Sequence, residues 1–436
     1  MQVEVEVKKD VLYFFKDLPG SLRNLGTALW KAARKISFDK ALLIWALAII
    51  AGVFLFRILN RDIRANLIFA TWWEDTLEEQ TLSNLAAEFV AKNPGITVKL
   101  EKMNWEAIQK NLEEHAGENG RNAKRQRTLD IFSIDPHAVR ELERRSYLAK
   151  LENNEKNSGN AMPVIAFINP LFYNIDLLQD AGFDRPPKNR TEFLSYVQRL
   201  KETGHYGAGL ALEKPHNMDN QILSWIWAAA GNPESEKPFS FSSKEVIETL
   251  SFLNQLKQNL YPNPFELSET ELLNAFGQGK VGMIIGSTAD IQKLKQVKVN
   301  FGITTIPDPE SYIKEPVFPL TVWYAGINSQ SIQQEEAKIF LDFLKEKAGD
   351  IAAVIYAVPG DGVRSRELSR KDPYYAKAFD MYEAGDMVWE LYSPDINSFY
   401  SIVHREIESM FRGNKTPEQC AQTIQQEWNR IAETTP

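Results

Sequence analysis

Cysteine and histidine are scarce in this sequence, and their scarcity excludes several kinds of protein. Among its 436 residues there is one cysteine, Cys420, so no disulfide can form within the chain. The five histidines lack the H-E-x-x-H spacing of a zinc protease, and the sequence contains neither a G-x-S-x-G nucleophile elbow nor a P-loop. We therefore expect no metal, no cofactor and no enzymatic activity. A carbohydrate-active enzyme with two catalytic carboxylates is an open alternative, because such a pair leaves no sequence signature.

Basic residues do not predominate either. The sequence has 58 acidic and 50 basic residues, which gives a formal net charge of −8 at pH 7. A nucleic-acid-binding protein would show a basic face, so we exclude nucleic acid as a partner. Hydrophobic residues make up 44% of the chain and charged residues 25%, as in an ordinary globular protein. The chain beyond residue 60 is too long for one hydrophobic core, and we expect two lobes there.

Long apolar runs are absent except at residues 41–56 (ALLIWALAIIAGVFLF), which contain no polar side chain. With Ile58 and Leu59 the run approaches the ~20 residues that a helix needs to cross a membrane, and we predict a transmembrane helix over 41–60. More basic residues precede the run than follow it: Arg23, Lys31, Arg34, Lys35 and Lys40 before it, and Arg57, Arg61 and Arg64 after it. The positive-inside rule then places the amino terminus in the cytoplasm and the chain beyond residue 60 on the extracytoplasmic side of the cytoplasmic membrane.

A cleaved signal peptide and a buried helix of a soluble protein are the alternatives for this run. A signal peptide has a short basic region and a small-residue cleavage site, whereas here residues 1–40 precede the run and FRILNRDIR follows it. A lipoprotein would have a cysteine just after the run. Within 1–40, apolar residues from Leu22 to Ile36 recur at helical spacing beside basic residues, which predicts a basic amphipathic helix on the inner leaflet. A loosely ordered tail is equally compatible with this pattern.

Strands and helices alternate after the apolar run. We expect strands at 66–70, 96–103 and 129–135, and helices at 75–93, 105–114 and 137–148. Short links between these elements favour a parallel sheet with helices on both faces, an α/β lobe. Such lobes bind ligands beyond the carboxyl ends of their strands.

Aromatic and acidic residues stand at those strand ends. Trp72, Trp73 and Glu74 follow the first strand, and Asp135 follows the third. Rings that stack on sugar faces, with carboxylates that accept from hydroxyls, are typical of a carbohydrate site. The structural alternative is that Asp135 caps the helix that Pro136 begins, and that one of the tryptophans belongs to the core, since neighbouring strand residues point to opposite faces.

Five blocks in the rest of the chain carry a family resemblance. The first, residues 172–207, contains Tyr173-Asn174, Ala181-Gly182, Pro186-Pro187 and Glu192-Phe193, and the second, residues 272–291, contains Phe276, Gly279, Lys280 and Met283. The others are FGITTIPDP with WYAGINSQSIQQEEAKIFLDFL, then YAVPGDGVRS, and finally residues 393–431. In this order they resemble the family 1 extracellular solute-binding proteins, the sugar-binding subunits of ABC importers that include maltose-binding protein.

The sequence departs from the family pattern at two places. Asn189 and Arg190 stand where many members have threonine and tryptophan, at a structural turn. Thr288 stands where the maltose binder has a sugar-stacking tryptophan. The resemblance therefore does not imply maltodextrin as the ligand.

The resemblance implies a two-lobe periplasmic-binding-protein fold of type II, in which the chain crosses between lobes near 163–167 and 318–323 and again before the terminal helices. The expected lobes are 62–165 with 320–372, and 166–319 with 373–436. The ligand would lie in the cleft, contacting Trp72, Trp73, Glu74, Asp135, Phe167, Thr288, Trp323, Tyr324, Phe399 and Tyr400. Hinge closure around a small solute, a carbohydrate in this family, would prepare a monomer for delivery to ABC permease subunits. A ligand sensor with a signalling partner is the alternative.

Overall fold

The part of the chain that the computed structural model describes begins with a parallel sheet. That part comprises residues 65–73, 77, 79–116, 128–151, 160–233, 239–309, 316–358, 367, 370–388 and 396–434, within the compact unit Ala65–Pro436. The predicted amphipathic segment 1–40 and transmembrane helix 41–60 lie outside the described residues. No helix in the described ranges is long and apolar enough to cross a membrane.

The first lobe has the predicted alternation of strands and helices. Its elements are β1 (Ala65–Thr71), α4 (Glu79–Lys92), β2 (Ile96–Lys102), α5 (Trp105–Ala116), β3 (Ile131–Ile134) and α6 (Val139–Arg144). Strand β1 pairs in parallel with β2 and with β3, which confirms the parallel α/β prediction. Helix α4 begins at Glu79, later than the predicted Asp75, and Asp75 itself lies outside the described residues.

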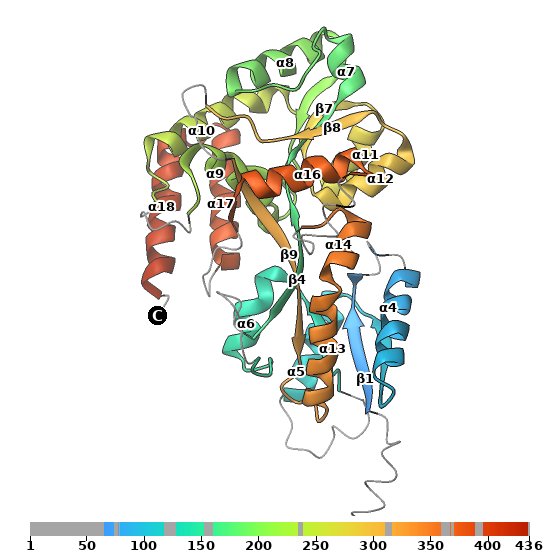
Figure 1. Cartoon of the computed structure of the whole chain (residues 1–436). Helices are drawn as coiled ribbons and strands as arrows, with labels where there is room; N and C mark the ends of the chain where they lie inside the picture. The colour runs from blue at the N-terminus through green and yellow to red at the C-terminus, as the bar shows by residue number, and fades with distance from the viewer. Residues whose placement is uncertain are drawn as a thin grey trace, which may run out of the picture. The chain divides into compact units, whose positions relative to one another are not determined.

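Helices cover both faces of this sheet because the side chains of β1 alternate. Leu67 and Phe69 pack in one core with α4 and with α13 (Gln334–Glu346), whereas Ile68 and Ala70 pack in another with α5 and α6. Helix α14 (Ala348–Ile355) contributes Ile351 to the first of these cores. Figure 1 shows α4 and α13 beside β1.

Two long strands cross from this lobe to the next. Strand β4 (Met162–Ile168) pairs antiparallel with β9 (Val317–Ile327), and β9 also pairs antiparallel with β3 and in parallel with β10 (Asp386–Val388). These strands coincide with the two predicted crossings, and they complete a six-stranded sheet. Figure 1 shows β4 and β9 running together through the middle of the unit. The lobe boundaries given above stay a prediction.

The second lobe contains a four-stranded sheet in the order β6-β7-β5-β8. Its strands are β5 (Leu171–Asn174), β6 (Tyr206–Gly209), β7 (Val281–Ile285) and β8 (Phe301–Thr304). Its helices are α7 (Ile175–Asp180), α8 (Arg190–Glu202), α9 (Ser224–Ala230), α10 (Lys244–Leu256), α11 (Glu269–Gly277), α12 (Ile291–Val297), α16 (Pro373–Ala384), α17 (Ile396–Phe411) and α18 (Pro417–Thr434). The shorter turns are η2 (Pro136–Ala138) in the first lobe, and η3 (Pro215–Asn217), η4 (Asp219–Leu223), η5 (Lys257–Asn259) and η6 (Thr288–Asp290) in the second.

Close packing links two of the sequence blocks in this sheet. Gly302 of β8 pairs with Tyr173 of β5, and a Cβ on Gly302 would lie 2.3 Å from the tyrosine ring. A side chain at position 302 would therefore displace Tyr173. The ring covers the glycine and fixes the spacing of the two strands.

The structure explains the departure at Asn189 and Arg190. Asn189 caps α8, since its Oδ1 accepts from the Glu192 backbone N–H at 2.8 Å. Arg190 is buried, and its guanidinium donates at 2.8 Å both to Thr249 Oγ1 and to the Trp225 carbonyl. Burial lowers the pKa of Arg190 to about 10. A hydrogen-bonded guanidinium thus fills a core position at this helix start.

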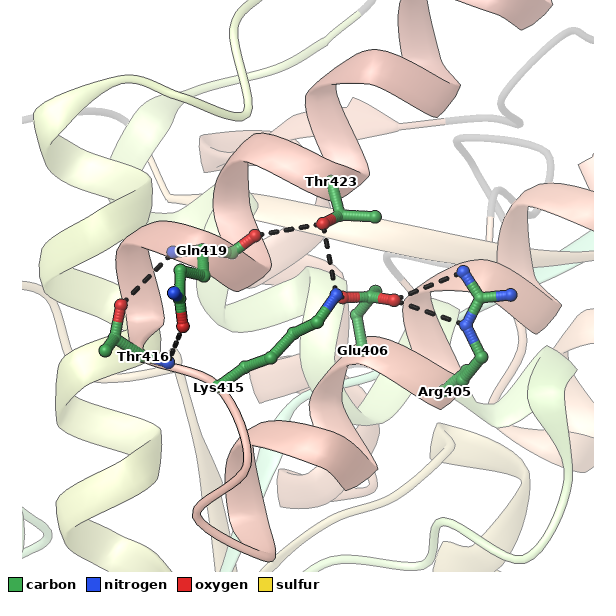
Figure 2. Close-up of polar contacts among 6 residues, drawn as sticks. All are labelled: Arg405, Glu406, Lys415, Thr416, Gln419 and Thr423. Atoms are coloured by element: carbon green, nitrogen blue, oxygen red, sulfur yellow. Dashed lines mark hydrogen bonds and ion pairs between the residues drawn. The ribbon is translucent and has the colours of Figure 1, made fainter.

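A buried glutamate joins the two C-terminal helices (Figure 2). Glu406 of α17 is 2% exposed and forms ion pairs with Lys415 and Arg405. Lys415 Nζ also donates to Thr423 Oγ1 of α18 at 3.2 Å. Thr416 and Gln419 cap α18 reciprocally, because each side chain accepts from the other's backbone N–H.

Candidate functional site

Two adjoining cavities lie beside β9, and the first of them lies between the turn that follows β3 and the second lobe. The first has a volume of about 210 Å³ and is lined by Asp135, Pro136, His137, His216, Asn217, Asp219, Asn220, Glu269, Leu320 and Thr321. The second, of about 240 Å³, shares Asn220, Glu269 and Thr321 with the first and adds polar groups from Asn169, Gln221, Ser287, Asp290 and Lys293. Strand β9 passes through both linings at Thr321. The cavities therefore form one cleft with walls from both lobes.

The wall of the first lobe is positioned by a helix start. Asp135 follows β3, and its Oδ1 accepts from the His137 backbone N–H at 2.9 Å, with Pro136 at the first position of η2. This confirms the predicted capping role of Asp135. Because the cap fixes the turn, it also directs the His137 side chain into the cleft lining.

Three rings meet at one end of the cleft. The Tyr400 ring, which is 1% exposed, meets the His137 ring edge to face with centroids 5.3 Å apart. The His216 ring lies 6.1 Å from that of His137. The hydroxyl of Tyr400 donates a hydrogen bond to the Asp219 carboxylate. Tyr400 of α17 thus touches both walls of the first cavity.

Three carboxyl groups of the second lobe, those of Asp219, Glu269 and Asp290, lie in surroundings that disfavour their ionised forms. Burial raises the pKa of Asp219 to about 6, although His137 and the Tyr400 hydroxyl favour its ionised form. Burial and the charge of Asp290 raise the pKa of Glu269 to about 7, although part of its surface still meets water within the cleft. Burial also raises the pKa of Asp290, against the attraction of Lys293 and a hydrogen bond from the Ser287 N–H. Burial lowers the pKa of His216.

Several residues expected at the ligand lie in the cores. Trp73 is fully buried and stacks on Trp323 with centroids 5.2 Å apart, and Phe167 packs against the edge of Trp323 at the same distance. Trp72 is half-buried and meets Trp105 edge to face at 6.1 Å. The prediction that one of the tryptophans belongs to the core is therefore confirmed for Trp73.

The remaining expected residues are distributed between core and cleft. Phe399 packs on Phe241 and Trp428, Tyr324 is buried beside β3, and Thr288 is buried with an unpaired hydroxyl oxygen. Glu74 lies outside the described residues. Asp135 lines the first cavity and Tyr400 contacts its wall. The contact of any of these residues with a ligand stays a prediction.

Sequence reasoning missed most of the cleft's polar residues. His137, His216, Asp219, Glu269 and Asp290 come from short turns and helix starts, in the stretches DPHAV, PHNMDN, LSETE and GSTAD. The one available signal was a run of polar residues between apolar elements. That signal is common to surface loops, so it could not distinguish a binding cleft.

Two α/β lobes that are joined by crossing strands around a polar cleft define a two-lobe binding protein. A family model described as bacterial extracellular solute-binding protein matches residues 74–351, and the chain belongs to this family. Its relatives are substrate-binding proteins, which supports a role without catalysis at the level of the family.

Individual relatives are distant. The ABC transporter periplasmic-binding protein YcjN of Escherichia coli (strain K12) is 24% identical over 304 residues, which cover 65% of this chain and 69% of YcjN. The sn-glycerol-3-phosphate-binding periplasmic protein UgpB of Salmonella typhimurium is 23% identical over 299 residues, covering 60% of this chain and 64% of UgpB. The GacH receptor of Streptomyces glaucescens, solved unliganded and with acarbose, superposes with a TM-score of 0.70 at 15% identity over 86% of this chain and 100% of GacH. The fold is therefore shared with GacH.

Proposed function

We propose that this protein captures a carbohydrate on the extracytoplasmic side of the cytoplasmic membrane and delivers it to the permease of an ABC importer. Membership of the solute-binding family and the ABC-transporter role named for YcjN support delivery to a permease. The acarbose complex of GacH, which has the same fold, supports a carbohydrate ligand.

This proposal rests on one observation, which is that the residues lining the cleft come from both lobes. His137 belongs to one lobe, and Asp219 and Glu269 belong to the other, on opposite sides of the same cavity. A solute that contacts both walls stabilises the closed arrangement of the lobes, because it binds that arrangement better than an open one. The permease would then recognise the closed form, which the protein reaches as a monomer.

The proposed anchor is the apolar segment 41–60, with 1–40 on the cytoplasmic side. It would keep the cleft close to the permease. Extraction of cell membranes with alkaline carbonate tests this point, because a spanning helix stays in the membrane fraction whereas a peripheral protein is released. Protease added to spheroplasts should digest the lobes and leave residues 1–40 protected, and protection of the lobes would refute the orientation.

A thermal-shift screen tests the binding role. The full-length chain in mild detergent is heated with a panel of oligosaccharides, monosaccharides and polyols. A ligand that binds only the native state adds ~2.7 kcal/mol of stability at 100 times its Kd, which is a shift of several degrees. Stabilisation by at least one carbohydrate is expected. If no member of the panel stabilises the protein, the proposed function fails.

A further inference from the structure

The cleft contains more negative than positive groups. Asp135, Asp219, Glu269 and Asp290 line it, and Lys293 is the one lysine or arginine among the described lining residues. Lys293 Nζ lies 4.0 Å from Asp290 Oδ1, and Asp135 is occupied by the backbone of η2. Asp219 and Glu269 are left without an ion-pair partner among the described residues.

Donors for these two carboxylates are also scarce. Asp219 accepts from the neutral hydroxyl of Tyr400. Glu269 has no hydrogen bond or ion pair within the described part of the chain, and Lys214 attracts it only at longer range. Asn220 contributes to the lining of both cavities, and its Oδ1 is buried with no hydrogen-bond partner among the described residues. The first cavity therefore presents acceptors that the described part of the chain does not satisfy.

Unsatisfied acceptors in a partly desolvated cavity define the chemistry of a matching ligand. Asp219 is half-buried and the Asn220 Oδ1 is buried, whereas Glu269 is exposed to solvent in the cleft. A buried acceptor without a donor is costly, so a ligand that donates gains most at Asp219 and Asn220. An ammonium group has three donors and a positive charge, and its hydrogen bonds to carboxylates are about twice as strong as neutral ones. A phosphate or carboxylate on the ligand would instead meet like charge and further acceptors.

We propose that the transported carbohydrate carries a basic nitrogen, and that its ammonium binds in the cavity that Asp219, Asn220 and Glu269 line. This inference rests on the proposed function and specifies its ligand class: an amino sugar or an amino-bearing oligosaccharide. A cationic sugar of this class differs from the phosphorylated solute in the name of UgpB, the sn-glycerol-3-phosphate-binding protein.

Two trisaccharides that differ in the acetylation of their amino groups test the inference. Glucosamine trimer and its fully N-acetylated counterpart have the same rings and linkages, but only the first carries ammonium groups. Titration calorimetry with the full-length chain at pH 7 and low ionic strength is expected to give at least 10-fold tighter binding of the amine. Glu269→Gln and Asp219→Asn should each remove most of this advantage.

The matched control is Glu266→Gln. Glu266 belongs to the same lobe but lines a separate depression beside Tyr206 and Tyr261, so this variant should keep the preference of the wild type. Equal or tighter binding of the acetylated trimer overturns the inference, as does a preference that survives in Glu269→Gln. If neutral carbohydrates bind and the amine has no advantage, the proposed function stands and only the inference fails. If no carbohydrate binds, both fail.

Discussion

The ring of His137 meets the ring of Tyr400 edge to face at a centroid distance of 5.3 Å, although the two residues come from opposite walls of the cleft. The same tyrosine donates its hydroxyl to Asp219. Tyr400 therefore connects the end of a strand in the first lobe with the acidic turn η4 of the second.

Tyr400→Phe tests this connection. Phenylalanine keeps the ring contact with His137 but removes the hydrogen bond to Asp219, so the pKa of Asp219 should rise above about 6. Without this hydrogen bond the Asp219 carboxylate can turn away from the ligand, and the loss of one ligand hydrogen bond to a carboxylate costs roughly 1.5 kcal/mol, which corresponds to about 10-fold weaker binding of the best ligand from the screen. Calorimetric titration measures the change.

The control for this substitution is Tyr206→Phe, at an exposed tyrosine outside the cleft, which should bind like the wild type. Tyr400→Ala removes the ring as well and should bind more weakly still. Wild-type affinity in Tyr400→Ala would show that the ring is not part of the ligand site.

Stability should depend on pH through Glu269. Its pKa is raised to about 7 in the folded protein from an ordinary value near 4.5. The folded state therefore holds the proton more tightly, and the stabilisation is complete below about pH 4.5 and lost as the pH rises through 7. Solvent in the cleft screens the charge of Glu269, so we expect its contribution to the free energy of unfolding to be about 1 kcal/mol or less. Urea unfolding of the unliganded protein at pH 5 and pH 7.5 measures it.

The comparison must be made against Glu269→Gln, because other groups of the cleft titrate in the same range. Asp219, with a pKa of about 6, changes stability in the same direction, whereas His216, whose pKa is lowered by burial, changes it in the opposite direction. Subtracting the profile of the variant leaves the contribution of Glu269. A variant whose profile equals that of the wild type would mean that Glu269 titrates as if it were fully exposed.

Local patterns were sufficient to predict the first lobe, and insufficient to predict the cleft. The strand β1, its parallel partner β2 and the cap at Asp135 each follow from a few adjacent residues. The cleft instead depends on tertiary packing, which brings Asp219 and Glu269 next to His137 from distant parts of the chain. No spacing in the sequence records that juxtaposition.

The aromatic residues illustrate the same limit. Trp323 and Tyr324 are neighbours on β9, so they point to opposite faces, and each lies in a different core. The family resemblance placed the crossing strand correctly near both residues. It could not determine which ring packs inward, because that depends on the helices that cover each face.

Lys295, Tyr356 and Asp372 form a polar cluster that should stabilise the fold measurably. Lys295 Nζ donates to Asp372 Oδ2 and to the Tyr356 hydroxyl, each at 2.8 Å, and Asp372 also caps α16. Asp372→Ala removes the cap and the hydrogen bonds that Lys295 and the Tyr356 hydroxyl donate to Asp372, and we expect a loss of about 2 kcal/mol in the free energy of unfolding. Asp380→Ala, at an exposed position of the same helix, should change it by less than about 0.5 kcal/mol. Urea denaturation separates the two variants, and equal stabilities would refute the role of the cluster.

Glu406, which is buried and ion-paired (Figure 2), can be compared with Glu408, a more exposed glutamate of the same helix, to measure what burial adds to the contribution of an ion pair. Glu406 is 2% exposed and Lys415 is its partner across the turn between α17 and α18, whereas Glu408 of α17 pairs with Arg412 near the surface. Glu406→Ala leaves the lysine beside an empty, desolvated site and should destabilise the protein by about 3 kcal/mol. Glu408→Ala should cost less than about 1 kcal/mol.

Cys420 provides the readout for this pair of variants. The thiol is fully buried near Glu406, and burial raises its pKa to about 12. It should therefore react with a thiol reagent only when α18 separates from α17 or the protein unfolds. Labelling of the native protein should be fastest in Glu406→Ala and unchanged in Glu408→Ala. Equal rates in the two variants would mean that the buried glutamate does not hold the helices together.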